Sequence, residues 1–331
     1  MKKVTMLDIA KMAGVSKATV SMVLSKHDQS ISEETRNKVL SLAKEMNYIP
    51  NSLARSLSTK KTGTIGIILP DITNPFFSSI ARAIEDEASL LGYNVIFCNT
   101  DNETNKEEKY IKLLISKLVD GVIFIAGGES ENSVKMLKHN NIPFVLVDRY
   151  IDTHEEEYGV YALNKDGVLK GIEYLYNEGS RRIAFVEGPK TLEISRQRLD
   201  GYKYSMNKYG LYDERLVFSG DFTIDGGIKA TESILQKTTN LDAIFYSNDA
   251  MALGGIKVLL KRGFKIPKDI RVLGFDNIEL SEIFEPELTT IAQPIYEMGK
   301  QSCKLLIDVI DAADVENKQI YFETELIIRE T

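Results

Sequence analysis

Hydrophobic positions near the start of the chain recur every three or four residues, the spacing of amphipathic helices. In TMLDIAKMAGVSKATVSMVL, Thr5 can cap a first helix, with Asp8 in a capping-box position. Gly14 is placed to end this helix in a left-handed conformation, and Ser16 can cap a second helix. A third helix is predicted from Ser32. Two helices joined by a tight glycine turn are typical of a helix-turn-helix unit.

The second helix leaves small and polar side chains on its outer face. The N-terminal part of such a helix reads base edges in the major groove of DNA. Lys17 can reach guanine acceptors or phosphate, and Ala18 can contact a thymine methyl group. The alternative is a small helical domain that binds protein. The candidate DNA-binding residues are Thr5, Ser16, Lys17, Ala18, Thr19, Ser21 and Met22.

A linker follows at residues 47–62. Pro50 breaks the third helix, and SLARSL can form a short helix that is marginal alone and becomes ordered on DNA or against a partner's copy. Leu57 can then act as a wedge in the minor groove. A flexible tether is the alternative. The candidates for DNA contact in the linker are Asn51, Ala54, Arg55 and Leu57.

From Thr64 onwards, short apolar strands alternate with amphipathic helices, which predicts parallel sheets covered by helices on both faces. The pattern breaks at a loop near 150–163 and then begins again, so we expect an α/β core of two similar, doubly wound lobes. LTTIAQP is interpreted as a crossover, followed by a helix over 295–310 and terminal strands over 319–329. The predicted strands include TIGIILP, NVIFCN, GVIFIAGG, IPFVLVD, RRIAFVEG, DAIFYSND and IRVLGFDN.

Polar residues follow several of these strands, where ligands bind on open parallel sheets. Each Asp or Asn has the alternative role of capping the next helix. Three phenylalanines near the same ends can stack on a ring or simply pack in the core, and Arg198 offers a planar fork of donors or a surface salt bridge. The strand-end residues are Asp71, Asp148, Arg149, Asn248, Asp249 and Asp276, and the phenylalanines are Phe76, Phe77 and Phe222.

The charge is divided unevenly along the chain. The whole chain carries a net charge of −7, which argues against a nucleic-acid partner. Residues 1–61, however, hold 11 Lys and Arg against 5 Asp and Glu, a net charge of +6, while the remainder holds 30 against 43, a net charge of −13. A basic end on an acidic body indicates that only the first part meets phosphate.

Composition excludes several other classes. No apolar run approaches the roughly 20 residues of a membrane helix, and the N-terminus lacks the apolar stretch of a signal peptide. Two cysteines, Cys98 and Cys303, provide neither a disulfide framework nor a metal site, which favours the cytoplasm. No motif of a catalytic serine, zinc, phosphate-loop or dinucleotide site is present, so we expect no enzyme. A transport receptor or an enzyme on a doubly wound sheet remain the competing classes.

These segments resemble the lac repressor/galactose repressor (LacI/GalR) family over essentially the whole length. The matching segments include TMLDIAKMAGVSKATVSMVL, NYIPNSLARSLSTKKTGTIGIILPDITNPFF, RQRLDGY, SNDAMALGG, VLGFDN and LTTIAQP. The resemblance implies a headpiece at 1–46, a linker with a hinge helix at 47–62, and a core like that of periplasmic sugar-binding proteins. The crossovers of that core put 63–162 plus 293–319 in the N-lobe and 163–292 plus 320–331 in the C-lobe.

The resemblance also implies a function. The chain would be a homodimeric repressor of a palindromic operator, with no cofactor and with a sugar or sugar phosphate as effector between the lobes. A phosphoprotein corepressor is the minority alternative. The family's groove readers fall on Lys17, Ala18, Met22 and Leu57. Its effector pocket falls on Phe76, Phe77, Asp148, Arg198, Phe222, Asn248 and Asp276, to which the strand-end position adds Asp71.

Two positions depart from the family pattern. Met22 stands where many relatives have a long polar residue, so base reading there is expected to be apolar or absent. Leu192 and Ile194 stand where the purine-binding relative is polar, which disfavours a purine.

Overall fold

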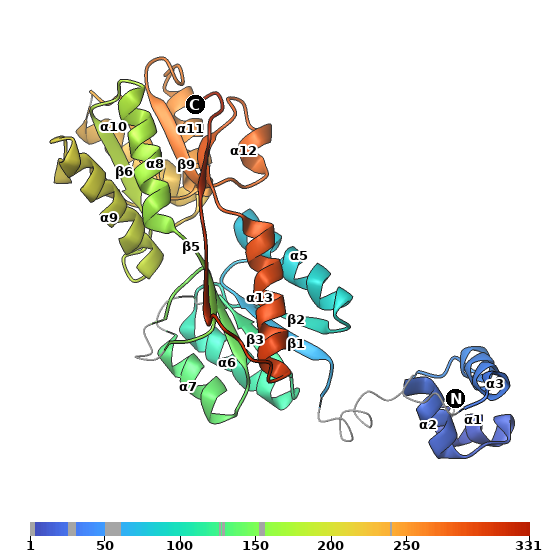
Figure 1. Ribbon diagram of the computed structural model, residues 1–331. Coiled ribbons are helices and arrows are strands. Elements are labelled where there is room, and N and C mark those ends of the chain that lie inside the picture. Colours follow the sequence, from blue (N-terminus) through green and yellow to red (C-terminus); the bar gives the residue numbers. More distant parts are fainter. Residues whose placement is uncertain are drawn as a thin grey trace. The chain divides into compact units, whose positions relative to one another are not determined.

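The computed structural model of the protein divides into two compact units, Met1–Thr62 and Gly63–Thr331 (Figure 1). The linker candidates Asn51, Ala54, Arg55 and Leu57 lie outside the residues that the structure describes. The described residues are 4–25, 31–49, 61–125, 127, 130–151, 156–238 and 240–331.

The first unit contains three helices, which begin and end at the predicted signals. They are α1 (Met6–Ala13), α2 (Lys17–Ser25) and α3 (Glu33–Glu45). Thr5 and Asp8 form a complete capping box, and Gly14 ends α1 with φ 74°. Ser16 Oγ accepts a hydrogen bond from the backbone N–H of Thr19 at 3.0 Å, which caps α2 as predicted.

The three helices close one small hydrophobic core. Leu24, Leu42 and Met46 are partly buried at the edge of this core. The fully buried members are Ile9, Ala10, Ala13, Val20, Val23, Val39 and Ala43.

The second unit contains two lobes, each built on a six-stranded sheet (Figure 1). The sheet of the N-lobe has the order β11-β5-β4-β3-β1-β2 and is parallel throughout. Helices α5 and α13 pack together on one face, and α6 and α7 cover the other. The strands are β1 (Thr64–Leu69), β2 (Asn94–Asn99), β3 (Gly121–Phe124), β4 (Phe144–Val147), β5 (Gly159–Ala162) and β11 (Gln319–Phe322); the helices are α5 (Pro75–Leu90), α6 (Thr104–Ser116), α7 (Glu131–His139) and α13 (Ile295–Ile310).

The sheet of the C-lobe has the order β12-β10-β9-β8-β6-β7, parallel except for the antiparallel edge strand β12. Helices α8 and α9 pack on one face, and α10 and α11 on the other. The strands are β6 (Ile183–Glu187), β7 (Val217–Ser219), β8 (Ala243–Tyr246), β9 (Arg271–Asp276), β10 (Thr289–Ala292) and β12 (Glu325–Ile327); the helices are α8 (Asn164–Asn177), α9 (Glu193–Lys208), α10 (Ile224–Lys237), α11 (Asp249–Lys261), the short α12 (Leu280–Ile283) and a 3-10 turn at Glu214–Leu216.

The structure corrects the prediction in the connections between the lobes. The loop expected near 150–163 contains β5, and the crossover LTTIAQP contains β10. Each strand has only four residues, which is a weak signal in the sequence. Each is stabilised by hydrogen bonds to a neighbouring strand on both sides. The expected boundary between 319 and 320 falls inside β11, so residues 320–322 belong to the N-lobe sheet. Neither α8 nor β7 is among the predicted elements.

Three crossovers join the lobes, namely β5 to α8, β10 to α13 and β11 to β12. The first two share an unusual backbone conformation. Leu163 has φ −76° and ψ 75°, and Pro294 has φ −77° and ψ 66°. Both pairs of angles are those of an inverse γ-turn, which turns the chain sharply within three residues.

No helix within the described ranges is long and apolar enough to cross a membrane.

Candidate functional site

A cavity between the lobes is lined by residues from strand ends and from the first turns of helices. Parallel strands end at the same edge of their sheet, so residues far apart in the sequence meet there. Seven of the eight predicted effector-binding residues lie in this lining. The N-lobe contributes Asn74, Phe76, Phe77, Asp148 and Arg149, and the C-lobe contributes Ile194, Arg198, Phe222, Asn248 and Asp276.

Arg198 lies at the centre of the C-lobe side and is only 2% exposed, so the alternative of a surface salt bridge is wrong. Its Nε donates to Asn164 Oδ1 at 2.8 Å, and its Nη1 donates to the carbonyl oxygen of Ser247. The guanidinium carbon lies 3.8 Å from the centroid of the Phe275 ring. Nη2 lies 3.7 Å from Asp276 Oδ1. These contacts hold the planar fork in one orientation at the cavity.

Two buried carboxylates face this arginine. Burial raises the pKa of Asp276 well above its usual range, although Arg198 opposes the shift. The side-chain amide of Gln293 donates to Asp276 Oδ1 at 2.8 Å. Burial also raises the pKa of Asp148, against the attraction of Arg149 and Arg198. Among the described residues, no hydrogen-bond donor reaches Asp148 Oδ1, so this oxygen is ready to accept a hydrogen bond from a ligand.

We expect the variant Asp148→Asn to be more stable than the wild type at pH 7.5. Because the pKa of Asp148 is raised, the folded core binds this proton more tightly than the unfolded chain does. Its contribution to stability is full below the ordinary aspartate pKa and is lost as the pH rises through the raised value. The amide stays neutral, and a gain of about 1 kcal/mol would raise the melting temperature by about 2–4 °C.

Urea unfolding of both proteins from about pH 4 upwards measures this effect, and the advantage of the variant should grow as the pH rises from the ordinary aspartate pKa to the raised one. Asp213→Asn is the matched control, because a hydrogen bond from Arg215 lowers the pKa of the half-buried Asp213. That variant should gain no stability. A stability difference between Asp148→Asn and the wild type that does not change with pH would contradict the raised pKa.

Arg149 is the second cation of the cavity, and the sequence placed it at a strand end without assigning it to the site. Its guanidinium carbon lies 5.1 Å from the centroid of the Phe77 ring, and its Nη1 donates to Asn102 Oδ1 at 3.2 Å. Burial lowers its pKa to about 10, so it remains charged at neutral pH. The cavity therefore pairs two cations with two carboxylates.

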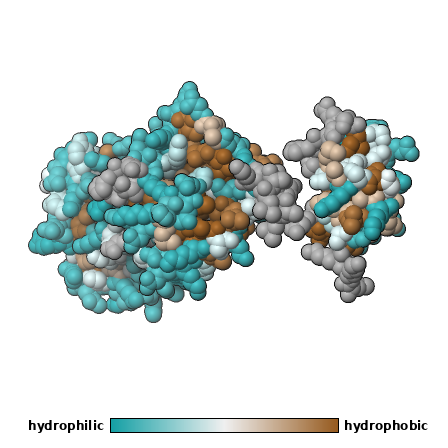
Figure 2. All heavy atoms as spheres, turned by 90° about the horizontal axis from the view of Figure 1, so that it is seen from below, coloured by the Kyte–Doolittle hydropathy of each residue, from teal (hydrophilic) through white to brown (hydrophobic). Residues whose placement is uncertain are grey.

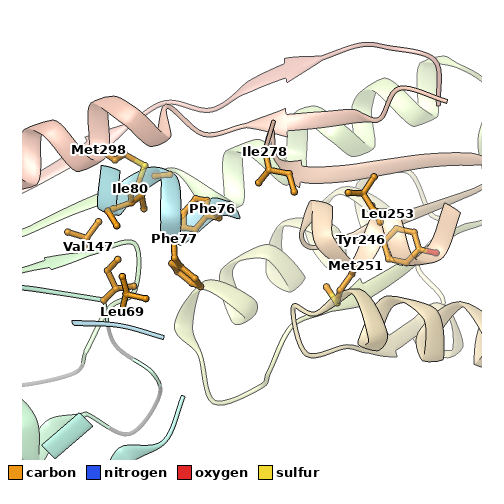
Figure 3. Close-up of a cluster of buried hydrophobic side chains, with 14 of the residues drawn as sticks. Leu69, Phe76, Phe77, Ile80, Val147, Tyr246, Met251, Leu253, Ile278 and Met298 are labelled. Carbon is orange, nitrogen blue, oxygen red and sulfur yellow. The ribbon is translucent and has the colours of Figure 1, made fainter. Parts of the chain in front are cut away.

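Three aromatic rings complete the wall. Phe76 and Phe77 meet edge to face with centroids 5.2 Å apart, and Figure 3 shows them between the N-lobe side chains around Val147 and the C-lobe side chains around Tyr246. Both phenylalanines pack in the core and line the cavity. On the C-lobe, Gly188 leaves room for Phe222, because a Cβ at this glycine would lie 2.2 Å from the Phe222 ring.

Three lining residues have positive φ angles although they are not glycines. Asp148 has φ 65°, Phe222 has φ 67° and Asp276 has φ 123°. Such conformations cost free energy, about 1–3 kcal/mol each, and persist only where the surrounding structure imposes them. They turn the side chains at three strand or loop ends into one cavity.

The space between these side chains is small, about 20 Å³. That volume holds roughly one water molecule, whereas ligand pockets usually measure about 300–1,000 Å³. This conformation therefore brings the two sides of the cavity together, and a ligand the size of a sugar needs a small separation of the lobes or a shift of these side chains to enter.

Asp71 is the one predicted member that does not line the cavity. Its Oδ1 accepts hydrogen bonds from the backbone N–H and the hydroxyl of Thr73, at 2.9 and 2.7 Å. It thus stabilises a local turn, while the predicted alternative of capping the next helix falls to Asn74. Asn74 also lines the cavity but was not predicted, and Ile194 was named only for its departure from the purine-binding relative and not as an effector-binding residue. Asn74 caps α5 and lies beside Phe76 and Phe77 in the NPFF segment, and this proximity was the signal available for it.

The headpiece presents a second candidate surface on α2. Lys17, Ala18, Ser21 and Met22 are exposed, and Thr19 is half-buried. The Thr5 hydroxyl donates to Asp8 Oδ2 at 2.7 Å. The hydroxyls of Ser16 and Thr19 lie 2.9 Å apart. In this structure, therefore, the candidates Thr5 and Ser16 cap helices, the Thr19 hydroxyl bonds to the Ser16 cap, and the contact of all three with DNA remains a prediction.

Comparisons with known proteins cover the whole chain. Residues 5–51 match the family described as bacterial regulatory proteins, lacI family, and residues 62–330 match periplasmic binding proteins and sugar binding domain of LacI family. The ribose operon repressor of Halalkalibacterium halodurans is 41% identical over 327 residues, which are 99% of this chain and 96% of the relative. The chain belongs to the LacI family.

Two solved structures of this family resemble the chain closely. The Lac repressor dimer bound to operator and the anti-inducer ONPF is 28% identical, with a TM-score of 0.90 over 100% of this chain and 99% of the other. A LacI family transcriptional regulator from Enterococcus faecium with bound ribose is 31% identical, with a TM-score of 0.74 over 81% of this chain and 97% of the other. This LacI-family chain is a DNA-binding transcription regulator, which decides against the enzyme and the transport receptor.

Proposed function

We propose that this LacI-family regulator is a repressor whose effector is a neutral pentose. The pentose that we propose is D-ribose, and its binding releases the repressor from the operator. The observation that carries the proposal is the composition of the interlobe cavity. Carboxylates accept hydrogen bonds from hydroxyl groups, arginines donate to hydroxyl and ring oxygens, and phenylalanines cover the apolar faces of a sugar ring.

The balance of charge supports a neutral sugar over a sugar phosphate. Arg149 and Arg198 face Asp148 and Asp276, so the cavity has no surplus positive charge when all four groups are ionised. A phosphate group would add about two negative charges to a buried site without further cations, at a high desolvation cost.

Two relatives support the choice of ribose. One is named ribose operon repressor, and the regulator from Enterococcus faecium was solved with bound ribose. The nearly full coverage of the first relative means that headpiece and core are shared together. A repressor of ribose use would be released by the sugar, which sets the direction of the proposed response.

Calorimetric titration of the full-length protein with D-ribose, D-ribose 5-phosphate and D-glucose tests this proposal. We expect ribose to bind at least about tenfold more tightly than ribose 5-phosphate, a difference of about 1.4 kcal/mol. A preference for the phosphate would contradict the charge argument. Binding of glucose without ribose would overturn the pentose assignment.

We further propose that the chain acts as a homodimer in the cytoplasm, where its DNA target lies. The Lac repressor is a dimer on its operator in the structure that this chain resembles. Figure 2 shows hydrophobic surface on the part of the N-lobe that carries α5 and β2. Leu90 is 81% exposed at the end of α5, and Phe97 is 49% exposed on β2, the edge strand of its sheet. Such a patch on a soluble protein marks an interface, and a dimer would match a palindromic operator.

A further inference from the structure

Asn164 lies where the chain first crosses between the lobes. It is the first residue of α8 and comes two residues after Ala162, the last residue of β5 in the N-lobe sheet. Its side chain is buried, at 1% exposure, and it is not part of the cavity lining. The ligand-binding assignment therefore leaves its role open.

The Asn164 amide makes one hydrogen bond toward each lobe. Its Oδ1 accepts from Arg198 Nε at 2.8 Å, in the C-lobe side of the cavity. Its Nδ2 donates to the carbonyl oxygen of Ala162 at 3.1 Å, at the end of the N-lobe sheet. A flipped amide would place its NH₂ against the guanidinium N–H and its oxygen against the carbonyl, so only one orientation satisfies both partners.

The backbone beside this amide is a pivot between the lobes. Leu163 has the inverse γ-turn angles described above, and its N–H donates to the carbonyl oxygen of Phe322 at 2.9 Å, where the third crossover begins. Hinge motions are absorbed by a few residues at the ends of elements. A rotation of the lobes must therefore change the direction of the Ala162 carbonyl relative to α8.

We propose that Asn164 is a positioning residue that makes the orientation of the Arg198 guanidinium depend on the angle between the lobes. Rotation that pulls the Ala162 carbonyl away costs the amide one of its two bonds, and the amide then turns away from Arg198 Nε. Conversely, a ligand that fixes Arg198 favours the lobe angle at which both bonds exist, because coupling between two equilibria is reciprocal. This inference rests on the proposed effector binding in the cavity.

The second crossover places an amide against the other charged group of the C-lobe side, although this amide bonds toward the C-lobe alone. Gln293 lies beside Pro294, which has the inverse γ-turn angles, and it donates to the buried carboxylate of Asp276 at 2.8 Å. Both charged groups on the C-lobe side of the cavity are thus hydrogen-bonded to a side chain at a crossover. The side chains that hold these two charged groups therefore lie at two of the crossovers between the lobes.

The variants Asn164→Asp and Asn164→Ala test the proposal. An aspartate, kept ionised by Arg198, can still accept a hydrogen bond from Arg198 Nε. It presents an oxygen to the Ala162 carbonyl, so this variant keeps the first bond and loses the second. Alanine removes both. Asn207→Asp is the matched control, because Asn207 Nδ2 donates to the carbonyl oxygen of Lys203 at 2.8 Å on an exposed part of α9.

The readout is the ratio of the D-ribose dissociation constants of operator-bound and free full-length protein. We expect a ratio of at least about tenfold in the wild type and in Asn207→Asp, within the usual range of allosteric coupling. In both Asn164 variants the ratio should fall at least about fivefold towards one. A merely structural role would raise both constants together, and an unchanged ratio in Asn164→Asp would overturn the proposal.

A second measurement does not depend on the identity of the sugar. Spin labels at Lys135→Cys on α7 and Lys229→Cys on α10, both exposed positions, report the distance between the lobes by pulsed electron resonance. In sugar-free protein, Asn164→Asp should broaden or shift the distribution relative to Asn207→Asp. Identical distributions would overturn the inference. Absence of ribose binding by the wild type would refute only the proposed ligand.

Discussion

Replacing Arg198 with alanine should abolish the response of operator binding to ribose. The ribose dissociation constant should rise at least about 100-fold, or about 2.7 kcal/mol. The fork lies between Asn164, the Ser247 carbonyl and Asp276, so its loss removes the donors for sugar oxygens together with the group that holds them in place. The remaining buried carboxylates would take up protons, because burial already raises their pKa values.

Operator affinity without sugar should stay within about threefold in this variant, because the headpiece is a separate compact unit with its own core. Calorimetry and fluorescence anisotropy with a labelled operator measure the two effects. Arg215→Ala is the control, because the Arg215 side chain is 86% exposed, pairs with Asp213 and does not line the cavity. Unchanged release by ribose in Arg198→Ala would mean that the sugar binds elsewhere.

The double variant Leu90→Asp, Phe97→Asp should convert the protein to monomers. Leu90 and Phe97 place exposed apolar surface on α5 and on the edge strand β2, and two buried, unpaired charges in each protomer would oppose association. We expect the dimer dissociation constant, measured by analytical ultracentrifugation, to rise at least about 100-fold. Operator affinity should fall with it, since a palindromic operator is bound by both headpieces.

Leu118→Asp provides the matched control for this experiment. Leu118 is 62% exposed in the turn after α6, on the face of the N-lobe sheet opposite to α5. Its φ of 57° suits aspartate, which tolerates the left-handed region. This variant should remain a dimer. A dimeric Leu90→Asp, Phe97→Asp protein would place the interface on another face.

The headpiece was predictable in detail because its signals are local. Thr5 and Asp8 lie three residues apart, Gly14 supplies the left-handed turn, and the spacing of apolar residues alone identifies the core. In the second unit, most of the longer buried strands and helices were equally clear, but α8 (Asn164–Asn177) was missed. The short strands β5 and β10 were missed, because their stability comes from neighbouring strands distant in the sequence.

The sequence predicted which strand ends line the cavity, but not which of the side chains at those ends point into it. Asp71 and Asp148 look alike in the sequence, yet one caps a turn and the other faces the cavity, because the backbone at Asp148 has φ 65°. The roles of Asn164 and Gln293 could not be predicted. Their bonds to Arg198 and Asp276 span 34 and 17 residues, and only the packed lobes bring them together.

The most direct test of the central claim is a titration of the full-length protein with its operator, with and without D-ribose. The operator can be selected from random palindromic DNA, and anisotropy gives the dissociation constant at fixed salt, on which the affinity depends strongly. We predict that saturating ribose raises this constant at least about tenfold, about 1.4 kcal/mol. Ribose that binds the protein and leaves the operator affinity unchanged would contradict the claim.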